Sequence, residues 1–400
     1  MTASGASLPL PRPGTSGRHA ARRGARAVAA TAAATTAPGA RDRYLDLLRA
    51  LALVRVVTYH TFGWAWLSLV FPSLGVMFAL AGSFMARSLE KRPALPVVRR
   101  RLRRLLPPLW CLGAVLVPAM LLHGWSPAEH HAGRWWARLL WWVVPLADPP
   151  GSAWAEQATG VLWYVRAYLW FVLLSPLLLR VFRRSPTAVL VASLAPVVLL
   201  QTLRSPPEGG AGSAVTDLAT FLTCWLLGFA HHDGLLDRAR AGLAPVLAAV
   251  GMAIGGWWAW SHRADGSYDL NEIPLAQALW SAGFVLLLLR FRPGAGPAGR
   301  LRTLDRAARI VSARAVTVYL WHEVALMLSV PLIDLMWRVR LLELSLPLDS
   351  TWFQFAVAWV LIAVAVLLLG RVEDLAAGRR PRLLPDPGRS GPVVGGGSYR

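Results

Sequence analysis

The sequence predicts an all-α integral membrane protein, a polytopic bundle of about ten transmembrane helices. Hydrophobic residues make up 55% of the 400 residues and charged residues only 16%, which is too few to cover the surface of a soluble domain of this length. The 20 Trp residues gather near the ends of apolar runs, where interfacial anchors are expected. The net charge of +21 does not indicate nucleic-acid binding, because the basic residues fall between the apolar runs and form no basic face with stacking aromatics.

Ten apolar runs are long enough to cross the hydrocarbon core of a bilayer, which takes about 20 helical residues. The fifth run is the weakest, since Pro196 and the nearby Pro206-Pro207 interrupt it. The Trp-rich segment 134–146 is too short to span, and we expect it in the membrane interface. The runs cover residues 45–63, 70–88, 105–123, 161–180, 187–203, 215–231, 242–260, 274–290, 312–336 and 352–370.

The distribution of positive charge predicts the orientation. If the N-terminus is cytosolic and ten helices alternate, most of the 42 Arg and Lys residues fall in segments on the cytosolic side. An odd number of helices would remove this bias, so we expect both termini in the cytosol. No matched pair of Gly- or Pro-broken helices is evident in the two halves, which counts mildly against a transporter built from inverted repeats.

We divide the chain into three parts: a basic disordered tail (residues 1–43), a membrane domain (44–371) and a second disordered tail (372–400). Both tails are rich in Arg, Gly and Pro. The first contains a pair of Arg residues that a cleaved signal could also carry, although the run that would be its apolar core is nearly all Ala.

The sequence supports neither a disulfide framework nor a metal site. Its two Cys residues, Cys111 and Cys224, both lie in apolar segments. The run His231-His232-Asp233 lies at the predicted cytosolic end of a helix, and we interpret it as a capping and interface cluster. We expect His130-His131, in an outside loop, to be solvated.

The first apolar run carries four ionisable residues, which are costly inside a bilayer. Arg49 and His60 are eleven residues apart, about three turns, so they share one helix face at a separation of about 16 Å. Asp46 lies three residues before Arg49 and is close enough to pair with it, whereas Arg55 lies off this stripe. From spacing alone, Arg49 could equally be a snorkelling border residue, and His60 a hydrogen-bonded contact between helices.

This run resembles the opening of the acyltransferase-3 family of membrane O-acyltransferases. The stretch LDLLRALA (45–52) followed by Tyr59-His60 is similar to the family's LDGLRaiA, with its Arg, ten residues and a His, although Leu47 replaces the usual Gly. Three basic or aromatic motifs follow in the family's order, spanning residues up to 326: RRRLRRLLPPLW (99–110), LWYVRAYLWFVLLSPLL (162–178) and VTVYLWHEVAL (316–326). The stretch GVMFALAGSFM (75–85) also resembles a family motif, with Ala81 in place of Ser, and Ala315 and Val316 replace a Ser-Tyr pair before the last one.

The resemblance implies an enzyme that transfers an acyl group, most simply acetyl, from cytosolic acyl-CoA to a hydroxyl of a glycan or glycosylated small molecule. It implies that His60 is the base or briefly carries the acyl group, and that Arg49 holds the donor or polarises its thioester. Arg101 and Arg104 match the family's Arg-x-x-Arg pair and would bind the donor's phosphates. Acyl-CoA would be a co-substrate, with no permanently bound cofactor.

Two more ionisable residues lie inside predicted helices. Arg166 should be paired or line a cavity. Glu323 could accept a hydrogen bond from His60 or Arg55, and we include it among the catalytic residues. Because adjacent helix positions point about 100° apart, we do not expect His322 and Glu323 to serve the same atom.

Two other functions remain open from the sequence. The buried charges could line the path of a transporter or flippase for lipid-linked sugars, or the protein could be a catalytically inactive sensor. On the leading hypothesis the partners are the lipid bilayer, acyl-CoA and a carbohydrate acceptor, with no nucleic acid. We expect a multi-pass protein of a bacterial plasma membrane.

Overall fold

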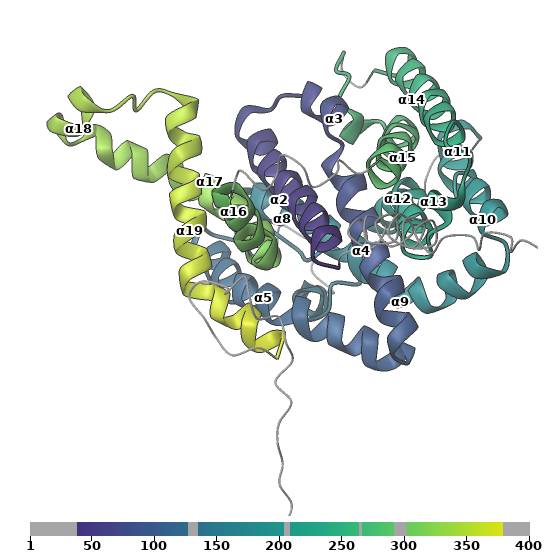
Figure 1. The fold of residues 1–400 in the computed structure, drawn as a ribbon. Helices are drawn as coiled ribbons and strands as arrows, with labels where there is room; N and C mark the ends of the chain where they lie inside the picture. Colours follow the sequence, from purple (N-terminus) through teal and green to yellow (C-terminus); the bar gives the residue numbers. More distant parts are fainter. Residues whose placement is uncertain (1–37, 127–134, 204–208, 264–265, 292–301, 379–400) are drawn as a thin grey trace, which may run out of the picture.

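The computed structural model describes residues 38–126, 135–203, 209–263, 266–291 and 302–378, and in these ranges the chain forms a bundle of helices (Figure 1). In chain order the elements are α2 (Pro38–Phe62), α3 (Trp66–Val70), α4 (Ser73–Lys91), α5 (Ala94–Leu122), α6 (Trp135–Arg138), α7 (Leu140–Val143), η2 (Ala153–Ala155), α8 (Glu156–Gly160), α9 (Trp163–Arg184), α10 (Pro186–Ala192), α11 (Ala195–Thr202), α12 (Gly210–His232), α13 (Leu235–Arg238), α14 (Leu243–Ser261), η3 (Leu270–Glu272), α15 (Pro274–Arg290), α16 (Arg302–Ala313), α17 (Ala315–Trp337), α18 (Arg340–Ser345) and α19 (Thr351–Ala376). The all-α prediction is confirmed for the described ranges.

Seven segments of the described chain are long and apolar enough to cross a membrane: Trp66–Lys91, Ala94–Leu122, Trp163–Arg184, Gly210–His232, Leu243–Ser261, Ala315–Trp337 and Thr351–Ala376. The other three predicted runs are helical but do not reach these limits. They are the charge-bearing α2, the 17-residue α15 and the pair α10 and α11, which are separate helices with Pro at the start of each. A multi-pass membrane protein is therefore confirmed, and the count of ten helices and the cytosolic termini stay predictions.

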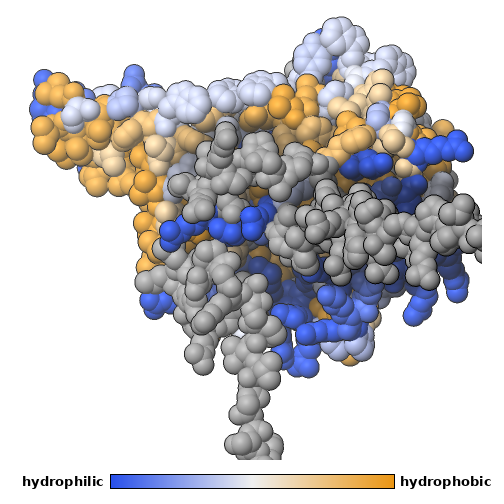
Figure 2. All heavy atoms as spheres, in the orientation of Figure 1, coloured by the Kyte–Doolittle hydropathy of each residue, from blue (hydrophilic) through white to orange (hydrophobic). Residues whose placement is uncertain are grey.

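The surface agrees with a membrane location. In Figure 2 apolar side chains cover much of the upper part of the molecule, and hydrophilic side chains gather at its lower end. The helices α14 and α19 expose their apolar surface in the same way, because only 22% of the apolar stretch of each is buried inside the bundle. A soluble protein would not expose such continuous apolar helix faces.

Glycine allows α4 and α12 to touch backbone to backbone. A Cβ on Gly228 would lie 2.1 Å from the carbonyl oxygen of Ala79, and one on Gly82 would lie 2.3 Å from that of Trp225. Any larger residue at either position would force the helices apart. Trp225 is fully buried and donates from Nε1 to Ser175 Oγ at 3.0 Å, which ties this pair of helices to α9.

Helix α17 packs against α2, α5, α8 and α19, and this position brings its polar residues close to those of the first helix. Its partner α19 ends at Ala376, beyond the predicted domain boundary at residue 371. The reason is that Glu373 and Asp374 are buried and hydrogen bonded instead of forming part of a tail. At the other end α2 begins at Pro38, before the predicted start at residue 44. The predictions for residues 1–37 and 379–400, and for His130-His131, lie outside the described residues.

Candidate active site

Helix α2 carries Arg49 and His60 toward two different cavities. It runs without interruption from Pro38 to Phe62, and its apolar side is buried through Leu48, Leu53 and Val57. Arg49 lines a smaller cavity that we call the arginine cavity, and His60 lines a larger one that we call the histidine cavity. Arg49 and His60 therefore lie along one helix, as predicted, but each of them lines a different cavity.

His60 contacts Glu323 of α17 directly. Its Nδ1 lies 2.6 Å from Glu323 Oε1, and the Glu323 side chain is only 1% exposed. A carboxylate at this position can accept a hydrogen bond from Nδ1–H, which fixes the imidazole tautomer and leaves Nε2 as a proton acceptor. The predicted closeness of Glu323 to His60 is present, and the hydrogen bond between them stays our prediction. The pair has the arrangement that a general base and its orienting carboxylate require.

His322 belongs to the same cluster, and the expectation that it does not serve the same atom as Glu323 stays a prediction. Its ring lies 5.2 Å from that of His60, and its Nε2 lies 3.5 Å from Glu323 Oε1. The backbone positions do diverge, but both side chains are long enough to turn toward His60. The Nδ1–H of His322 donates to the backbone oxygen of Tyr319 at 2.5 Å, so the buried ring has a fixed orientation.

His60, His322 and Glu323 are also the group, among the described residues, whose ligand atoms all lie within 4.8 Å of one another and could hold a metal ion. The distance between the His60 and Glu323 atoms fits a proton between them better than a metal ion. Two ligands at about 2.1 Å from a tetrahedral zinc ion lie about 3.4 Å apart, whereas the His60 and Glu323 atoms are 2.6 Å apart, a hydrogen-bond distance. The absence of a metal from the mechanism therefore stays our prediction.

The histidine cavity has a volume of about 560 Å³, and its lining contains several charged residues and amides among apolar surface. Arg166 is completely buried and is bracketed by the carboxylates of Asp148 and Asp217, both of which also line the cavity. Burial raises the pKa of Asp148, and the neighbouring Arg166 guanidinium partly offsets this effect. The expectation that Arg166 is paired and lines a cavity is confirmed, and both of its partners were missed.

Arg55, which lies off the helix face shared by Arg49 and His60, also lines the histidine cavity. Its guanidinium lies over the ring of Tyr59 at 4.8 Å, and its Nε donates to the backbone oxygen of Leu67 at 3.4 Å. The Tyr59 hydroxyl in turn donates to Asp269, which comes from the segment before α15. In the described part of the chain Arg55 forms no hydrogen bond or ion pair with Glu323, and the C-terminal part of α2 is instead tied to the segment around Asp269.

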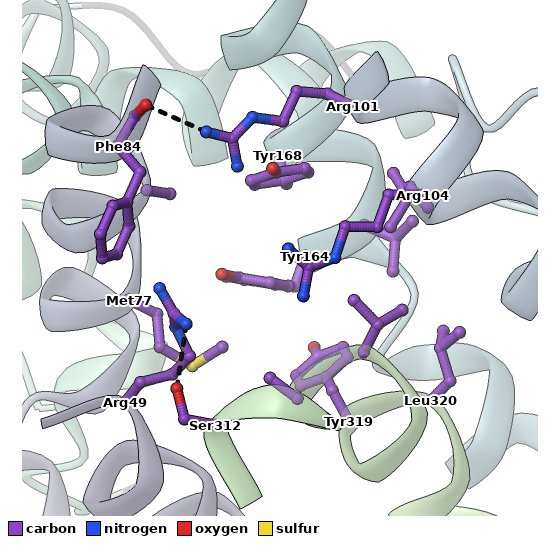
Figure 3. Close-up of a pocket in the computed structure, with 15 residues that line it drawn as sticks. Arg49, Met77, Phe84, Arg101, Arg104, Tyr164, Tyr168, Ser312, Tyr319 and Leu320 are labelled. Atoms are coloured by element: carbon purple, nitrogen blue, oxygen red, sulfur yellow. Dashed lines mark hydrogen bonds between the residues drawn. The ribbon is translucent and has the colours of Figure 1, made fainter. Parts of the chain in front are cut away.

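The arginine cavity, about 140 Å³ in volume, brings together the three predicted donor-site residues (Figure 3). Arg49 from α2 and Arg101 and Arg104 from α5 point into one space beside Tyr164 and Tyr168 of α9. Three guanidiniums around one partly apolar space form a site for a multiply charged anion with an apolar extension. The sequence predicted the residues, and the structure shows that they share one cavity.

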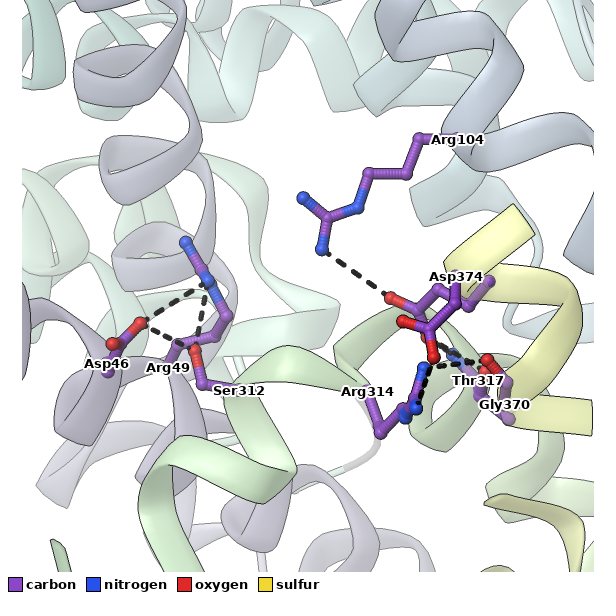
Figure 4. Close-up of polar contacts among 9 residues, drawn as sticks. Asp46, Arg49, Arg104, Ser312, Arg314, Thr317, Gly370 and Asp374 are labelled. Atoms are coloured by element: carbon purple, nitrogen blue, oxygen red, sulfur yellow. Dashed lines mark hydrogen bonds and ion pairs between the residues drawn. The ribbon is translucent and has the colours of Figure 1, made fainter. Parts of the chain in front are cut away.

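Each of these Arg residues has different hydrogen-bond or ion-pair partners; Figure 4 shows those of Arg49 and Arg104, and Figure 3 shows the bond of Arg101 to Phe84. Arg49 donates to Ser312 Oγ at 3.0 Å, and Ser312 donates to Asp46 at 2.8 Å, so the predicted Asp46–Arg49 pair is bridged by a hydroxyl. Arg104 lies 3.5 Å from Glu373 Oε1 at the end of α19. Arg101 donates to the backbone oxygen of Phe84 at 3.0 Å and to a neighbouring serine.

Sequence reasoning missed Ser312 and Glu373 because nothing local marks them as partners of α2 and α5. Glu373 accepts from the Thr317 hydroxyl at 2.9 Å, and its neighbour Asp374 pairs with Arg314 at 2.7 Å. These contacts join α19 to the start of α17. The available signal was a pair of acidic residues directly after an apolar run, a place where ionised groups need partners.

The His231-His232-Asp233 run caps α12, as predicted. His231 shares a hydrogen bond with Ser83 at 2.9 Å, and His232 contacts Glu90 at 3.0 Å. Asp233 is the C-cap residue and receives two hydrogen bonds from Arg183 at 2.8 and 2.9 Å. The run therefore connects three helix ends and has no part in either cavity.

A multi-pass helix bundle with a His residue beside a buried Glu in one cavity and a cluster of three Arg residues in another defines a class of membrane protein suited to group transfer. A family model described as an acyltransferase domain matches residues 42–370, and the chain belongs to this acyltransferase-3 family. The family match places it among the acyltransferases.

One curated relative shows a local similarity. BcsY of Komagataeibacter xylinus, which carries the name of a membrane-bound transacylase, is 42% identical over 87 residues. The match covers 21% of this chain and 22% of the relative, so the chain aligns with about a fifth of that protein's length. No solved structure matches the chain significantly.

Proposed function

We propose that this protein transfers an acyl group, most simply acetyl, from cytosolic acyl-CoA to a hydroxyl of a glycan or glycosylated small molecule. The observation that carries the proposal is the His60–Glu323 pair, 2.6 Å apart, at the wall of a cavity of about 560 Å³ that other charged residues also line. The family match supports acyl transfer in general. The donor, the acyl group and the acceptor are our inference from the two cavities.

The chemistry needs a base, because a neutral hydroxyl is a poor nucleophile. The acceptor hydroxyl would lose its proton to His60 Nε2 while its oxygen attacks the thioester carbonyl carbon. The carbon–sulfur bond then breaks, and the departing thiolate takes a proton from the imidazolium. Glu323 would stabilise the charged imidazolium through Nδ1–H. If His60 instead carries the acyl group, Nε2 is the attacking atom and the acceptor follows in a second step.

The donor would bind in the arginine cavity. Acyl-CoA is rich in phosphate, and guanidiniums bind phosphate oxygens with two parallel hydrogen bonds. Arg101 and Arg104 would hold the phosphates, and Arg49, deeper along α2, would face the pantetheine arm or the thioester. The cationic segment of α5 agrees with a cytosolic location of this cavity, which is where acyl-CoA is available.

The acceptor would bind in the histidine cavity. Carboxylates of Asp148 and Asp217, the amides of Asn271 and Gln277 and the ring of Trp163 line it. Side chains of these types match the many hydroxyls and the apolar ring face of a sugar. We place the protein in the plasma membrane of a bacterium, with this cavity open to the outer side.

The test is His60→Ala at wild-type protein level. Surface glycans and secreted metabolites from cells with the wild-type gene, the variant and no gene are compared by mass spectrometry. We expect one acyl increment that the wild type adds and both other strains lack. Unchanged acylation by His60→Ala would refute the role of His60, and labelled sugar moving across the membrane without any mass change would favour a transporter.

A further inference from the structure

Of the described residues, a single side chain lines both the arginine cavity and the histidine cavity. It is Tyr319 of α17. One turn earlier, Ala315 and Val316 face the arginine cavity, and one turn later Glu323 faces the histidine cavity. Helix α17 therefore passes from one cavity to the other, and Tyr319 is at the crossing point.

The Tyr319 ring is held from several sides. Its hydroxyl donates to the backbone oxygen of Val161 at 2.8 Å, a residue 158 positions away in the chain. Its ring centroid lies 4.8 Å from that of Tyr164, which lines the arginine cavity, and 5.4 Å from that of His322, which lies beside His60. The side chain is only 6% exposed. A large, anchored and buried ring thus forms a wall between the two spaces.

This wall stands where the proposed reaction needs a passage. The Arg residues that would hold the donor lie in one cavity, and the base lies in the other, about three helical turns further along α2. The acyl end of the donor must pass beside Tyr319 to reach His60. The space beside the ring then limits what passes.

We propose that Tyr319 is the septum between the two cavities and the residue that sets the acyl chain length, admitting short chains and excluding long ones. This proposal rests on the proposed function. A site that rejects an extra methylene discriminates by about 10- to 200-fold, so several methylenes would be excluded strongly while the ring is in place. The neighbouring Tyr168 lines the arginine cavity alone and has no such role.

The test compares acetyl-CoA with hexanoyl-CoA as donors for the purified protein and three variants. Tyr319→Ala should raise kcat/KM for hexanoyl-CoA relative to acetyl-CoA by at least about tenfold. Tyr319→Phe keeps the ring and should retain the wild-type preference. Tyr168→Ala, the matched control, should not raise the ratio. An unchanged ratio in an active Tyr319→Ala variant, or an equal rise in Tyr168→Ala, would overturn the assignment.

A second measurement needs no acyl transfer. Thr220 lines only the histidine cavity, so a Thr220→Cys probe with Cys111 and Cys224 replaced by Ala reports access to that cavity. In sealed vesicles an impermeant thiol reagent should label this cysteine from one face of the membrane. Adding Tyr319→Ala, or the bulkier Tyr319→Leu if the first variant does not fold, should permit labelling from both faces.

The two measurements separate the possible failures. If the reagent gains access but no donor or acceptor ever shows transfer, the septum stands and the proposed function fails. If transfer is observed but neither access nor chain length changes, the function stands and the septum is refuted. Labelling from both faces in the parent protein would also refute it.

Discussion

Glu323→Gln keeps the shape of the side chain that contacts His60 and removes its negative charge. The carboxylate is buried to 1% exposure and its Oε1 lies 2.6 Å from His60 Nδ1. In the variant, Nδ1–H still finds an oxygen, so the tautomer and the position of the ring should be kept. On the proposed mechanism, the variant loses the charge that would stabilise the imidazolium when Nε2 takes up the acceptor's proton.

The size of the effect follows from this contact. A hydrogen bond to a charged partner contributes about 1.5–3 kcal/mol. If this stabilisation acts only on the charged state of His60, the rate falls by about 10- to 150-fold, since each 1.36 kcal/mol is a factor of ten. The acyl-CoA KM should change little, because Glu323 does not line the arginine cavity.

The assay is release of free CoA thiol by purified protein with a saturating acceptor, normalised to the amount of folded protein. The matched control is Glu343→Gln, the same chemical change on α18, where Glu343 pairs only with the exposed Arg340. We expect the control to retain wild-type activity. A Glu323→Gln rate within about twofold of wild type would refute a base oriented by this carboxylate.

Two further predictions concern metal dependence and stability. Activity should fall by less than about twofold after dialysis against a chelator. The reason is that His60 Nδ1 and Glu323 Oε1, 2.6 Å apart, leave no room for a metal ion between them. A loss of activity that zinc restores would refute this prediction. Asp374→Ala should lower the melting temperature in detergent, because removing one partner of a buried ion pair costs about 3–5 kcal/mol. The exposed Asp349 provides the control, and an equal shift in Asp349→Ala would exclude a specific role of the Arg314–Asp374 pair.

Part of the site could be predicted from the sequence, because the signals for these residues are local. The spacing of Arg49 and His60 on one helix and the Arg101–Arg104 pair need only helical geometry to be interpreted. Charges inside apolar runs also identified Arg166 and Glu323 as residues in need of partners. The positions of the helices could also be predicted, because the length of an apolar run is a local signal.

The rest depends on which helices are neighbours, and a single sequence does not contain that information. Tyr319 is an unremarkable aromatic residue in an apolar run until the structure places it between two cavities. Glu373 is assigned to a tail by composition, although the fold brings it 3.5 Å from Arg104. His322 reaches the Glu323 carboxylate through the length of its side chain, which the direction of the helix backbone alone does not predict.

The arginine cavity, our proposed donor site, yields an ordering of its three Arg residues that the sequence could not provide. Arg104 is partly neutralised by Glu373, and Arg49 by Asp46 through Ser312, whereas Arg101 is held within the described residues only by a carbonyl and a hydroxyl. Arg101 therefore presents the least compensated charge to an incoming phosphate. We expect Arg101→Gln to raise the KM for acyl-CoA more than Arg104→Gln does, by up to the 10- to 150-fold that corresponds to about 1.5–3 kcal/mol.

Steady-state kinetics on the two single variants at several salt concentrations provide the measurement. Loss of Arg101 should also reduce the dependence of KM on salt concentration more than loss of Arg104. Salt screens the attraction of an uncompensated charge for the phosphate, whereas a charge already neutralised by a partner contributes little that salt can screen. Arg103→Gln, the same substitution on α5 at a position that lines neither cavity, is the control. If Arg104→Gln has the larger effect on KM, Glu373 does not reduce the charge that Arg104 offers, and the ordering drawn from these contacts is wrong.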